Sequence, residues 1–266
     1  LDSENANIYR ISYSKTEIVN TISKIEHPII RESLKIMKIP KGIEIVTIAD
    51  VPGNGTGLGS SSSLTVGLLN CLSTLKNQKM SHQRLAEMAC QLEIGKLKNP
   101  IGKQDQYFAA IGGLSILKFK PNEKVSIEKI KLSHKRSNEF EKQILCFYTG
   151  FNRKSSEILG SVKNKIKDNL EIYHEMKAQT SEAKKMLLKS SFNEFGELLN
   201  EQWKLKKKLN KKVSNSIIDL YYKKAIKLGA IGGKINGAGG GGFFTFYCEE
   251  KKQSKVKTPI TLLHQK

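Results

Sequence analysis

The sequence lacks several features that would mark other classes of protein. Its 266 residues include only four cysteines, Cys71, Cys90, Cys146 and Cys248, without the CxxC spacing of a zinc or redox site. They are too scattered for a disulfide framework, so we expect reduced cysteines in a cytoplasmic protein. No apolar run is long enough to cross a bilayer, and the polar start LDSENANIYR lacks the apolar core of a secretory signal. The composition therefore predicts a soluble globular protein that does not span a membrane.

Acidic residues are scarce relative to basic ones. The formal net charge is +20 at pH 7, which allows nucleic acid, an anionic membrane surface or phosphorylated small molecules as partners. Much of the excess is lysine, as in KLKKKLNKKV (204–213). Arginines are few, and no aromatic side chains alternate with these lysines as they would on a base-stacking surface. We therefore favour a solvated lysine face over nucleic-acid binding.

Hydrophobic periodicity predicts a chain of mixed α and β structure. The predicted strands cover 8–13, 43–49, 114–119, 144–148 and 243–248. The predicted helices cover 28–38, a segment starting near Ser60, 81–97, a helical block over 155–213, and 217–228. The order indicates two α+β halves, which we place at 1–140 and 141–266.

The segment PGNGTGLGSSSS (52–63) joins the predicted strand at 43–49 to the helix that follows. A helix N-terminus presents unpaired N–H groups, and glycines let a charged ligand approach the backbone. The segment lacks the Lys-Ser/Thr pair of a Walker A loop and the third glycine of a Rossmann fingerprint, and its serines are not spaced as in a nucleophile elbow. We favour a distinct phosphate-binding loop over simple turn chemistry.

Two further segments carry candidate chemistry. In INGAGGGGFF (235–244), Gly237, Gly239 and Gly242 satisfy the dinucleotide pattern formally, but a strand follows where that pattern needs a helix. A flexible linker is the alternative for this segment. In GKQDQY (102–107), Asp105 precedes an apolar, helix-like run. For an isolated aspartate, helix capping is the simpler explanation.

These three segments together resemble, in order, the motifs of the GHMP kinases, a family of sugar and metabolite kinases. The resemblance implies a two-domain α+β fold, with an N-terminal half like ribosomal protein S5 domain 2 and a ferredoxin-like C-terminal half. It also implies an ATP-dependent kinase acting on the anomeric hydroxyl of a heptose 7-phosphate, with a galactokinase- or fucokinase-like enzyme as the alternative. The family's first motif, of the form RISFAGGGTD, has no counterpart here, so we expect a further piece before Leu1, with a natural truncation as the alternative.

The resemblance also implies roles for individual residues. Asp105 would be the catalytic base, and Mg²⁺ would bind Ser61 or Ser62 together with Glu93, for which a surface glutamate is the alternative. The segment expected to bind the ATP phosphates comprises Gly55, Thr56, Gly57, Leu58, Gly59, Ser60, Ser61 and Ser62. The residues expected at the substrate are Lys103, Gln104, Arg153, Lys154, Gly237, Gly239 and Gly240. ATP and a sugar phosphate are the implied partners, and a homodimer stays open.

Overall fold

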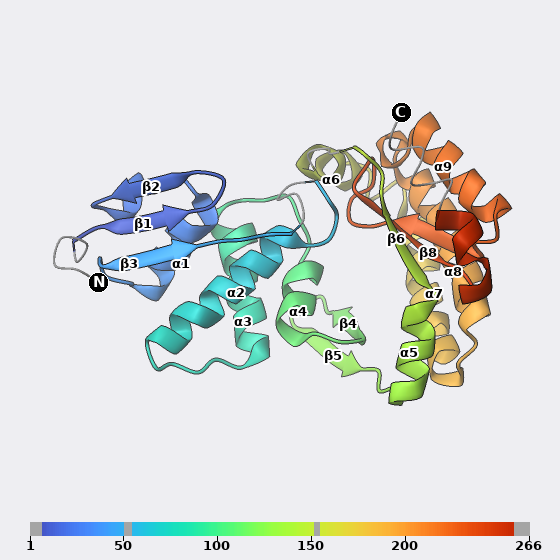
Figure 1. Ribbon diagram of the computed structural model, residues 1–266, viewed down its shortest axis with the longest axis horizontal. Helices are drawn as coiled ribbons and strands as arrows, with labels where there is room; N and C mark the ends of the chain where they lie inside the picture. Colours follow the sequence, from blue (N-terminus) through green and yellow to red (C-terminus); the bar gives the residue numbers. More distant parts are fainter. Residues whose placement is uncertain (1–6, 51–54, 152–154, 258–266) are drawn as a thin grey trace. The chain divides into compact units, whose positions relative to one another are not determined.

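The chain forms two compact units in the computed structural model, which describes residues 7–50, 55–151 and 155–257 (Figure 1). Unit 1 comprises Leu1–Gly53 and Gly59–Gly113, and unit 2 comprises Asn54–Leu58 and Leu114–Lys266. The expected division after residue 140 falls inside unit 2, because Leu114, Ile130 and Phe140 pack against Phe192 and Tyr247. The predicted mixture of helices and strands is confirmed.

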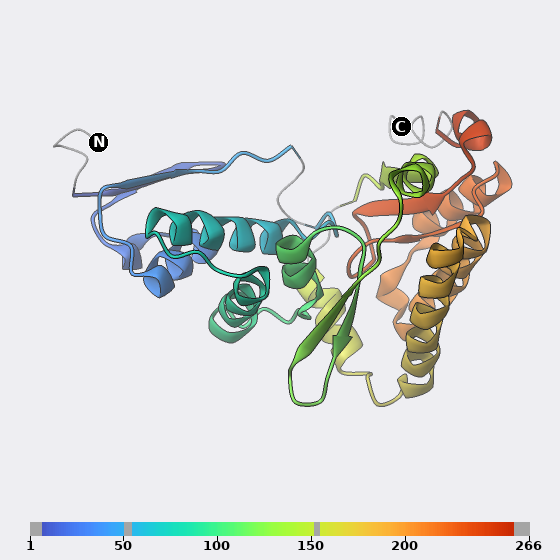
Figure 2. The ribbon, with the colours of Figure 1, turned by 90° about the horizontal axis from the view of Figure 1, so that it is seen from below.

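Unit 1 is a three-stranded sheet with helices on one side. The strand order is β2-β1-β3, formed by Thr16–Val19, Tyr9–Ser12 and Ile43–Val46, with β1 antiparallel to β2 and parallel to β3. The helices are η2 (Ile22–Lys24), α1 (Pro28–Met37), α2 (Ser60–Leu75), α3 (His82–Cys90) and α4 (Gln104–Ile111). Figure 2 shows these helices below the sheet. Alternate residues of β1, such as Ile11, are buried against Leu34 and Leu69 of the helices.

The predicted helix over 81–97 is interrupted. It begins as expected at N-cap Ser81, but α3 passes at Cys90 into a π-helical segment, η3 (Gln91–Lys96). The Leu97 N–H donates to Leu92 O at 2.9 Å, five residues back rather than four. The wider turn accommodates one more residue than an α-helix would, and Glu93 lies within it.

Unit 2 contains a hairpin and a second three-stranded sheet. The hairpin is formed by β4 (Ser115–Phe119) and β5 (Val125–Lys129), and the antiparallel sheet has the order β6-β8-β7, formed by Ile144–Tyr148, Phe243–Tyr247 and Gly232–Ile235. The helices are α5 (His134–Lys142), α6 (Ser155–Lys163), α7 (Leu170–Lys189), α8 (Phe192–Leu209), η4 (Lys211–Val213), α9 (Ser216–Lys227) and η5 (Glu250–Lys252). Its core joins Phe244 and Phe246 of β8 to Trp203 of α8 and Ile218 of α9.

The sequence did not predict β2, β5, β7 or α5. Each of these strands is only four or five residues long, and α5 contains no buried residue, so none carries a strong hydrophobic period. β7 resembles a loop because it contains two glycines. Gly232 lies so close to the backbone of Gly196 in α8 that a side chain could not fit between them. None of the described helices has the length and apolar character needed to cross a membrane.

Candidate active site

The first part of the site is the start of α2 in unit 1. The helix begins at Ser60, as predicted, and its N-cap residue is Gly59. Gly59 has a left-handed backbone (φ 71°, ψ 25°), and no side chain caps the helix. The helix N-terminus, with its positive dipole end, therefore lacks the side-chain oxygen that would usually accept from its N–H groups.

Glu93 is the centre of a hydrogen-bonded cluster in the same unit. Its side chain is fully buried, with 0% exposure. Ser61 Oγ donates to Glu93 Oε1, and Ser62 Oγ donates to Glu93 Oε2 at 2.9 Å. Gln106 Nε2 donates to the same Oε2 at 2.7 Å. The alternative of a surface glutamate is therefore wrong: the π-helical segment turns this carboxylate inward, onto the first-turn serines of α2.

Asp105 lies in the first turn of α4, where Lys103 and not Asp105 is the N-cap residue. The capping explanation therefore does not account for this aspartate. A Cβ added to Gly59 would lie 3.4 Å from the carboxyl carbon of Asp105, so the helix start and the aspartate are neighbours. Although the Asp105 side chain is exposed, desolvation by the surrounding protein raises its pKa, and the negative charge of Glu93 raises it further.

The donor set around Glu93 fits a magnesium ion. Mg²⁺ prefers hard oxygen ligands and is usually held by one or two carboxylates together with substrate phosphates. Glu93, Ser61 and Ser62 provide such oxygens, and Gln106 Oε1 is a buried oxygen without a hydrogen-bond partner. Among the described residues, no group of three or more His, Cys, Asp or Glu side chains is arranged so that it could hold a metal ion. A self-sufficient protein cage of acidic, thiol or imidazole ligands is thus not formed in this part of the chain.

The two glycine-rich loops contact each other within unit 2. Residues 55–58 of the first loop, which belong to unit 2, lie against residues 236–242 of the second loop. A Cβ added to Gly57 (φ 72°) would come within 2.7 Å of Asn236 O, and one added to Gly237 (φ 59°) within 2.7 Å of Gly57 Cα. Phe243 N–H donates to Thr56 O at 3.0 Å. The second segment is therefore a packed turn between β7 and β8, and the flexible-linker alternative is wrong.

The remaining predicted residues belong to both units. Gln104 is exposed at the start of α4, beside Lys103. Gly239 and Gly240 are buried in the second loop, whereas Gly237 is exposed. Arg153 and Lys154 lie outside the described residues.

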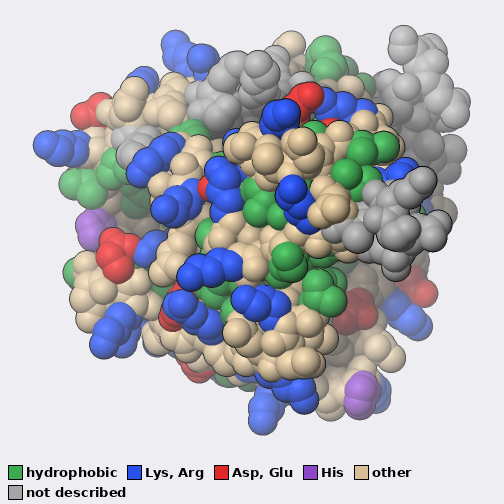
Figure 3. All heavy atoms as spheres, turned by 90° about the vertical axis from the view of Figure 1, so that its left-hand side faces the viewer, with side chains coloured by type: hydrophobic (Ala, Val, Ile, Leu, Met, Phe, Trp, Pro, Cys, Tyr) green, Lys and Arg blue, Asp and Glu red, His purple; other side chains and the backbone are tan. Residues whose placement is uncertain are grey.

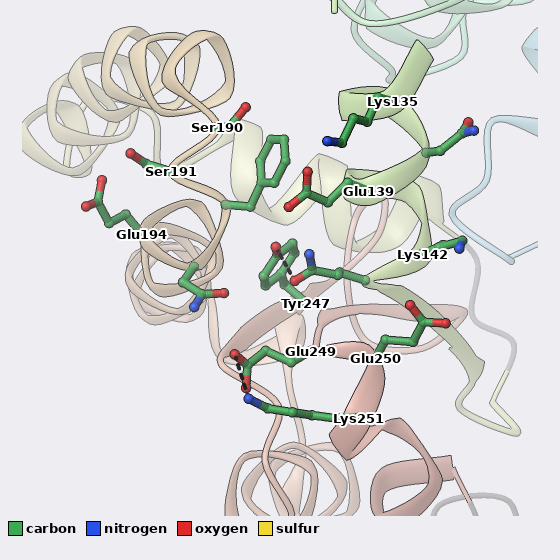
Figure 4. A pocket seen from close by; sticks show the side chains of 14 residues that line it. Lys135, Glu139, Lys142, Ser190, Ser191, Glu194, Tyr247, Glu249, Glu250 and Lys251 are labelled. Atoms are coloured by element: carbon green, nitrogen blue, oxygen red, sulfur yellow. Dashed lines mark hydrogen bonds and ion pairs between the residues drawn. The ribbon is translucent and has the colours of Figure 1, made fainter. Parts of the chain in front are cut away.

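A large cavity of unit 2 lies elsewhere. It measures about 880 Å³ and is bounded by α5, the turn between α7 and α8, and the end of β8. Figure 4 shows acidic and basic side chains around it, among them Lys135, Glu139, Glu194 and Lys251, with Tyr247 between them. None of the predicted site residues lines it. Its mixed charge favours no single class of ligand.

Sequence analysis missed two residues that lie close to predicted site residues. Gln106 is fully buried and donates to Glu93, although no sequence pattern distinguishes it from Gln104, the other glutamine of GKQDQY. The only signal was its position one residue after Asp105, on the face that an amphipathic helix buries. Lys206 lies in a lysine run and donates to the backbone of the second glycine loop. No local pattern distinguishes it from its neighbours.

Comparison with known proteins matches both parts of the chain to one family. The model of the GHMP kinases N terminal domain matches residues 20–113, and that of the GHMP kinases C terminal domain matches 183–261. The D-glycero-alpha-D-manno-heptose 7-phosphate kinase of Campylobacter jejuni is 30% identical over 95% of this chain and 75% of its own length. A mevalonate kinase of Thermococcus onnurineus is 27% identical over 98% of this chain and 75% of its own length.

Solved structures agree on the fold. A D-glycero-D-manno-heptose 1-phosphate kinase from Bacteroides thetaiotaomicron superposes with a TM-score of 0.78 at 24% identity, covering 98% of this chain and 78% of the other. A galactokinase of Lactococcus lactis gives a TM-score of 0.74 at 18% identity, covering 97% of this chain and 79% of the other. The glycine loops, the buried Glu93 and these matches over nearly the whole chain lead to one conclusion: the chain belongs to the GHMP kinases, ATP-dependent phosphotransferases.

Proposed function

We propose that this kinase phosphorylates the anomeric hydroxyl of D-glycero-D-manno-heptose 7-phosphate, giving the 1,7-bisphosphate for surface-polysaccharide synthesis. The observation that carries the proposal is the 30% identity to a heptose 7-phosphate kinase over 95% of the chain. The physical support is a helix start without a side-chain cap and a nearby carboxylate with a raised pKa.

Phosphoryl transfer requires mainly positioning and charge neutralisation. In our proposal, the backbone N–H groups of 55–62 hold the ATP phosphates at the start of α2. Ser61 and Glu93 hold Mg²⁺, which when bound neutralises phosphate charge, and Gln106 keeps the Glu93 carboxylate oriented. Asp105 accepts the proton of the sugar hydroxyl as that oxygen attacks the γ-phosphorus of ATP and ADP leaves. Lys103, Gln104 and Arg153 contact the sugar phosphate.

Two alternatives make different predictions. A galactokinase- or fucokinase-like enzyme would prefer a sugar without a phosphate. The L-fucokinase/L-fucose-1-P guanylyltransferase of Bacteroides fragilis is 28% identical over 86% of this chain and 24% of its own length. A nucleic-acid-binding protein is suggested by the charge of +20 and by the expected likeness of the N-terminal half to ribosomal protein S5 domain 2. On the face that Figure 3 shows, Lys and Arg side chains are scattered between hydrophobic and neutral ones. A dispersed charge of this kind is typical of a solvated surface.

The deciding experiment is a panel of acceptors assayed with Mg-ATP: heptose 7-phosphate, the free heptose, galactose, fucose and mevalonate. We expect the highest kcat/KM with heptose 7-phosphate. The product should lose its reducing end, because phosphorylation of the anomeric oxygen locks the ring. The Asp105→Asn protein serves as the blank for contaminating kinases. Preferred turnover of galactose or fucose would replace the proposal with the first alternative, and a product that still reduces would refute the anomeric position.

A further inference from the structure

A strongly basic stretch of the chain has no role in the proposed reaction. Residues 204–228, from the last turns of α8 through η4 and α9, contain nine lysines but one carboxylate, that of Asp219. Asp219 Oδ1 accepts from Lys207 Nζ at 3.1 Å, so this carboxylate is already paired. Lys204 pairs with Glu201 at 2.7 Å. The positive charge of the stretch therefore exceeds what nearby carboxylates neutralise.

Six lysines of this stretch are left for an external partner. Their ammonium groups make no hydrogen bond or ion pair within the part of the chain that the structure describes. Lys206 is not among them, because it donates to two backbone carbonyls of unit 2. The six are Lys208, Lys211, Lys212, Lys223, Lys224 and Lys227, all exposed except the half-buried Lys224. Water solvates these charges in the free protein, and their mutual repulsion would fall beside an anionic surface.

Two large apolar side chains are exposed among these lysines. Ile217 and Leu220 of α9 are 41% and 56% exposed. The opposite side of the same helix is buried in the core of unit 2 through Ile218 and Ala225. Residues three, four and seven positions apart share one face of an α-helix, so Leu220 lies on one face with the three lysines of α9. We call Ile217, Leu220 and the six lysines the basic face.

The combination of lysines and apolar side chains discriminates between two kinds of anionic partner. The phosphate backbone of a nucleic acid attracts lysines, but it offers no apolar environment to an exposed leucine. An anionic lipid bilayer offers both, because its headgroups attract lysines and the boundary of its acyl chains accepts apolar side chains. Lysine stems can also lie along apolar surface while the ammonium stays at the headgroups. The basic face therefore fits a bilayer better than a nucleic acid.

We propose that the basic face is a docking site for the surface of an anionic lipid bilayer. In this arrangement α9 lies along the headgroups, Leu220 enters the boundary of the acyl chains and the lysines face lipid phosphates. The contact is peripheral, and no described helix could cross the bilayer. The proposal does not depend on which sugar the kinase phosphorylates, because the basic face contains none of the predicted site residues.

The first test measures sedimentation of the full chain with lipid vesicles. One set contains phosphatidylcholine alone, and the other contains about one-third phosphatidylglycerol, which is anionic. We expect binding to the anionic vesicles only. Binding should be lost between about 0.15 M and 1 M salt, because the Debye length falls from about 8 Å to about 3 Å. Equal binding to both kinds of vesicle, or to neither, would overturn the inference.

Two sets of lysine substitutions test whether the charge must lie on the basic face. Replacing Lys212, Lys223 and Lys227 by glutamine should weaken binding to anionic vesicles by about 10- to 100-fold, since each lysine near such a surface contributes about fivefold. The control makes the same change in net charge at three exposed lysines elsewhere. These are Lys79, Lys120 and Lys131. The control should bind nearly as well as wild type, and an equal loss in both sets would contradict a localised docking site.

Leu220→Ser tests the apolar part of the basic face, with Leu75→Ser as its control. Leu75 is the last residue of α2 and is 63% exposed. We expect Leu220→Ser to weaken vesicle binding by about tenfold or more, the effect of an apolar side chain that leaves water. Leu75→Ser should bind vesicles as wild type does. A short DNA duplex should bind both serine variants equally, because phosphate contacts do not involve the leucine.

Equal vesicle binding by the two serine variants would refute the apolar contact and with it the inference. Duplex binding tighter than vesicle binding at the same salt concentration would assign the basic face to nucleic acid instead. Circular dichroism shows whether each variant folds. Should one not fold, hydrogen exchange on the wild-type protein decides. Anionic vesicles should slow exchange within 208–227 and leave unit 1 unaffected, and no local protection would refute the docking site.

Discussion

At the scale of single residues, a substitution of Asp105 tests whether this side chain acts in catalysis or only in structure. Asp105→Asn keeps the shape and removes the proton acceptor. If Asp105 is the base, we expect kcat to fall by about 10²–10⁴-fold. The affinities for ATP and the sugar phosphate should change little, because the loss affects the transition state. Asp168→Asn, the same exchange at an exposed position that is not among the predicted site residues, is the control.

The raised pKa of Asp105 gives two further expectations with definite signs. A base acts when ionised. The apparent pKa on the acid side of the kcat/KM profile should therefore lie above 3.8, the ordinary pKa of aspartate. Folding disfavours the ionised form of Asp105 in the unliganded protein. The free energy of unfolding should therefore fall as the pH rises above the ordinary aspartate pKa. Asp105→Asn should therefore melt no lower than wild type at neutral pH. If Asp105→Asn kept full activity, or melted at a lower temperature with unchanged kcat, Asp105 would have only a structural role.

At the scale of elements, the contact between the two glycine loops predicts the effect of Gly57→Ala. The new methyl group would meet Asn236 O at 2.7 Å, so the loops must separate. We expect ATP affinity to fall by about tenfold or more while the fold stays mostly intact.

Gly112→Ala is the matched control for that variant. Gly112 has a similar positive φ of 66°, but an added Cβ there meets no atom within 4 Å. Both variants should lose about 1–3 kcal/mol of stability, because a side chain is strained at a positive φ. Only Gly57→Ala should lose ATP affinity, as measured by calorimetry. Equal ATP binding by both would refute a role of the loop contact in nucleotide binding.

At the scale of the whole molecule, the charge of +20 predicts weak binding of nucleic acid that depends strongly on salt. Between about 50 and 200 mM salt, affinity for duplex DNA should fall by roughly 10³-fold or more. Replacing the exposed Lys208, Lys211 and Lys212 by glutamine should make the salt dependence shallower and leave ATP turnover unchanged. Tight, sequence-selective binding at about 150 mM salt would contradict the solvated-lysine interpretation.

Prediction from sequence succeeded where the physics is local. The start of α2 at Ser60 follows from glycines and serines next to an apolar period, and Ser81 caps α3 as expected. It failed where distant segments decide the outcome. β7 resembles a loop until α8 packs against Gly232, and Lys206 resembles a surface lysine until β7 supplies its carbonyls. The inward turn of Glu93 likewise depends on a helix that changes its winding after Cys90.

Because the helix changes its winding after Cys90, the position of Glu93 depends on the number of residues in this turn more than on which residues they are. Each residue of an α-helix turns by about 100°, so removing one residue ahead of Glu93 would rotate its carboxylate away from Ser61 and Ser62. Deleting the exposed Gln91 should therefore leave the helical content seen by circular dichroism nearly unchanged but abolish turnover, whereas Gln91→Ala should remain active. A fully active deletion variant would show that Glu93 is dispensable. Relatives that keep every site residue but lack one position in this turn would be expected to have lost the activity.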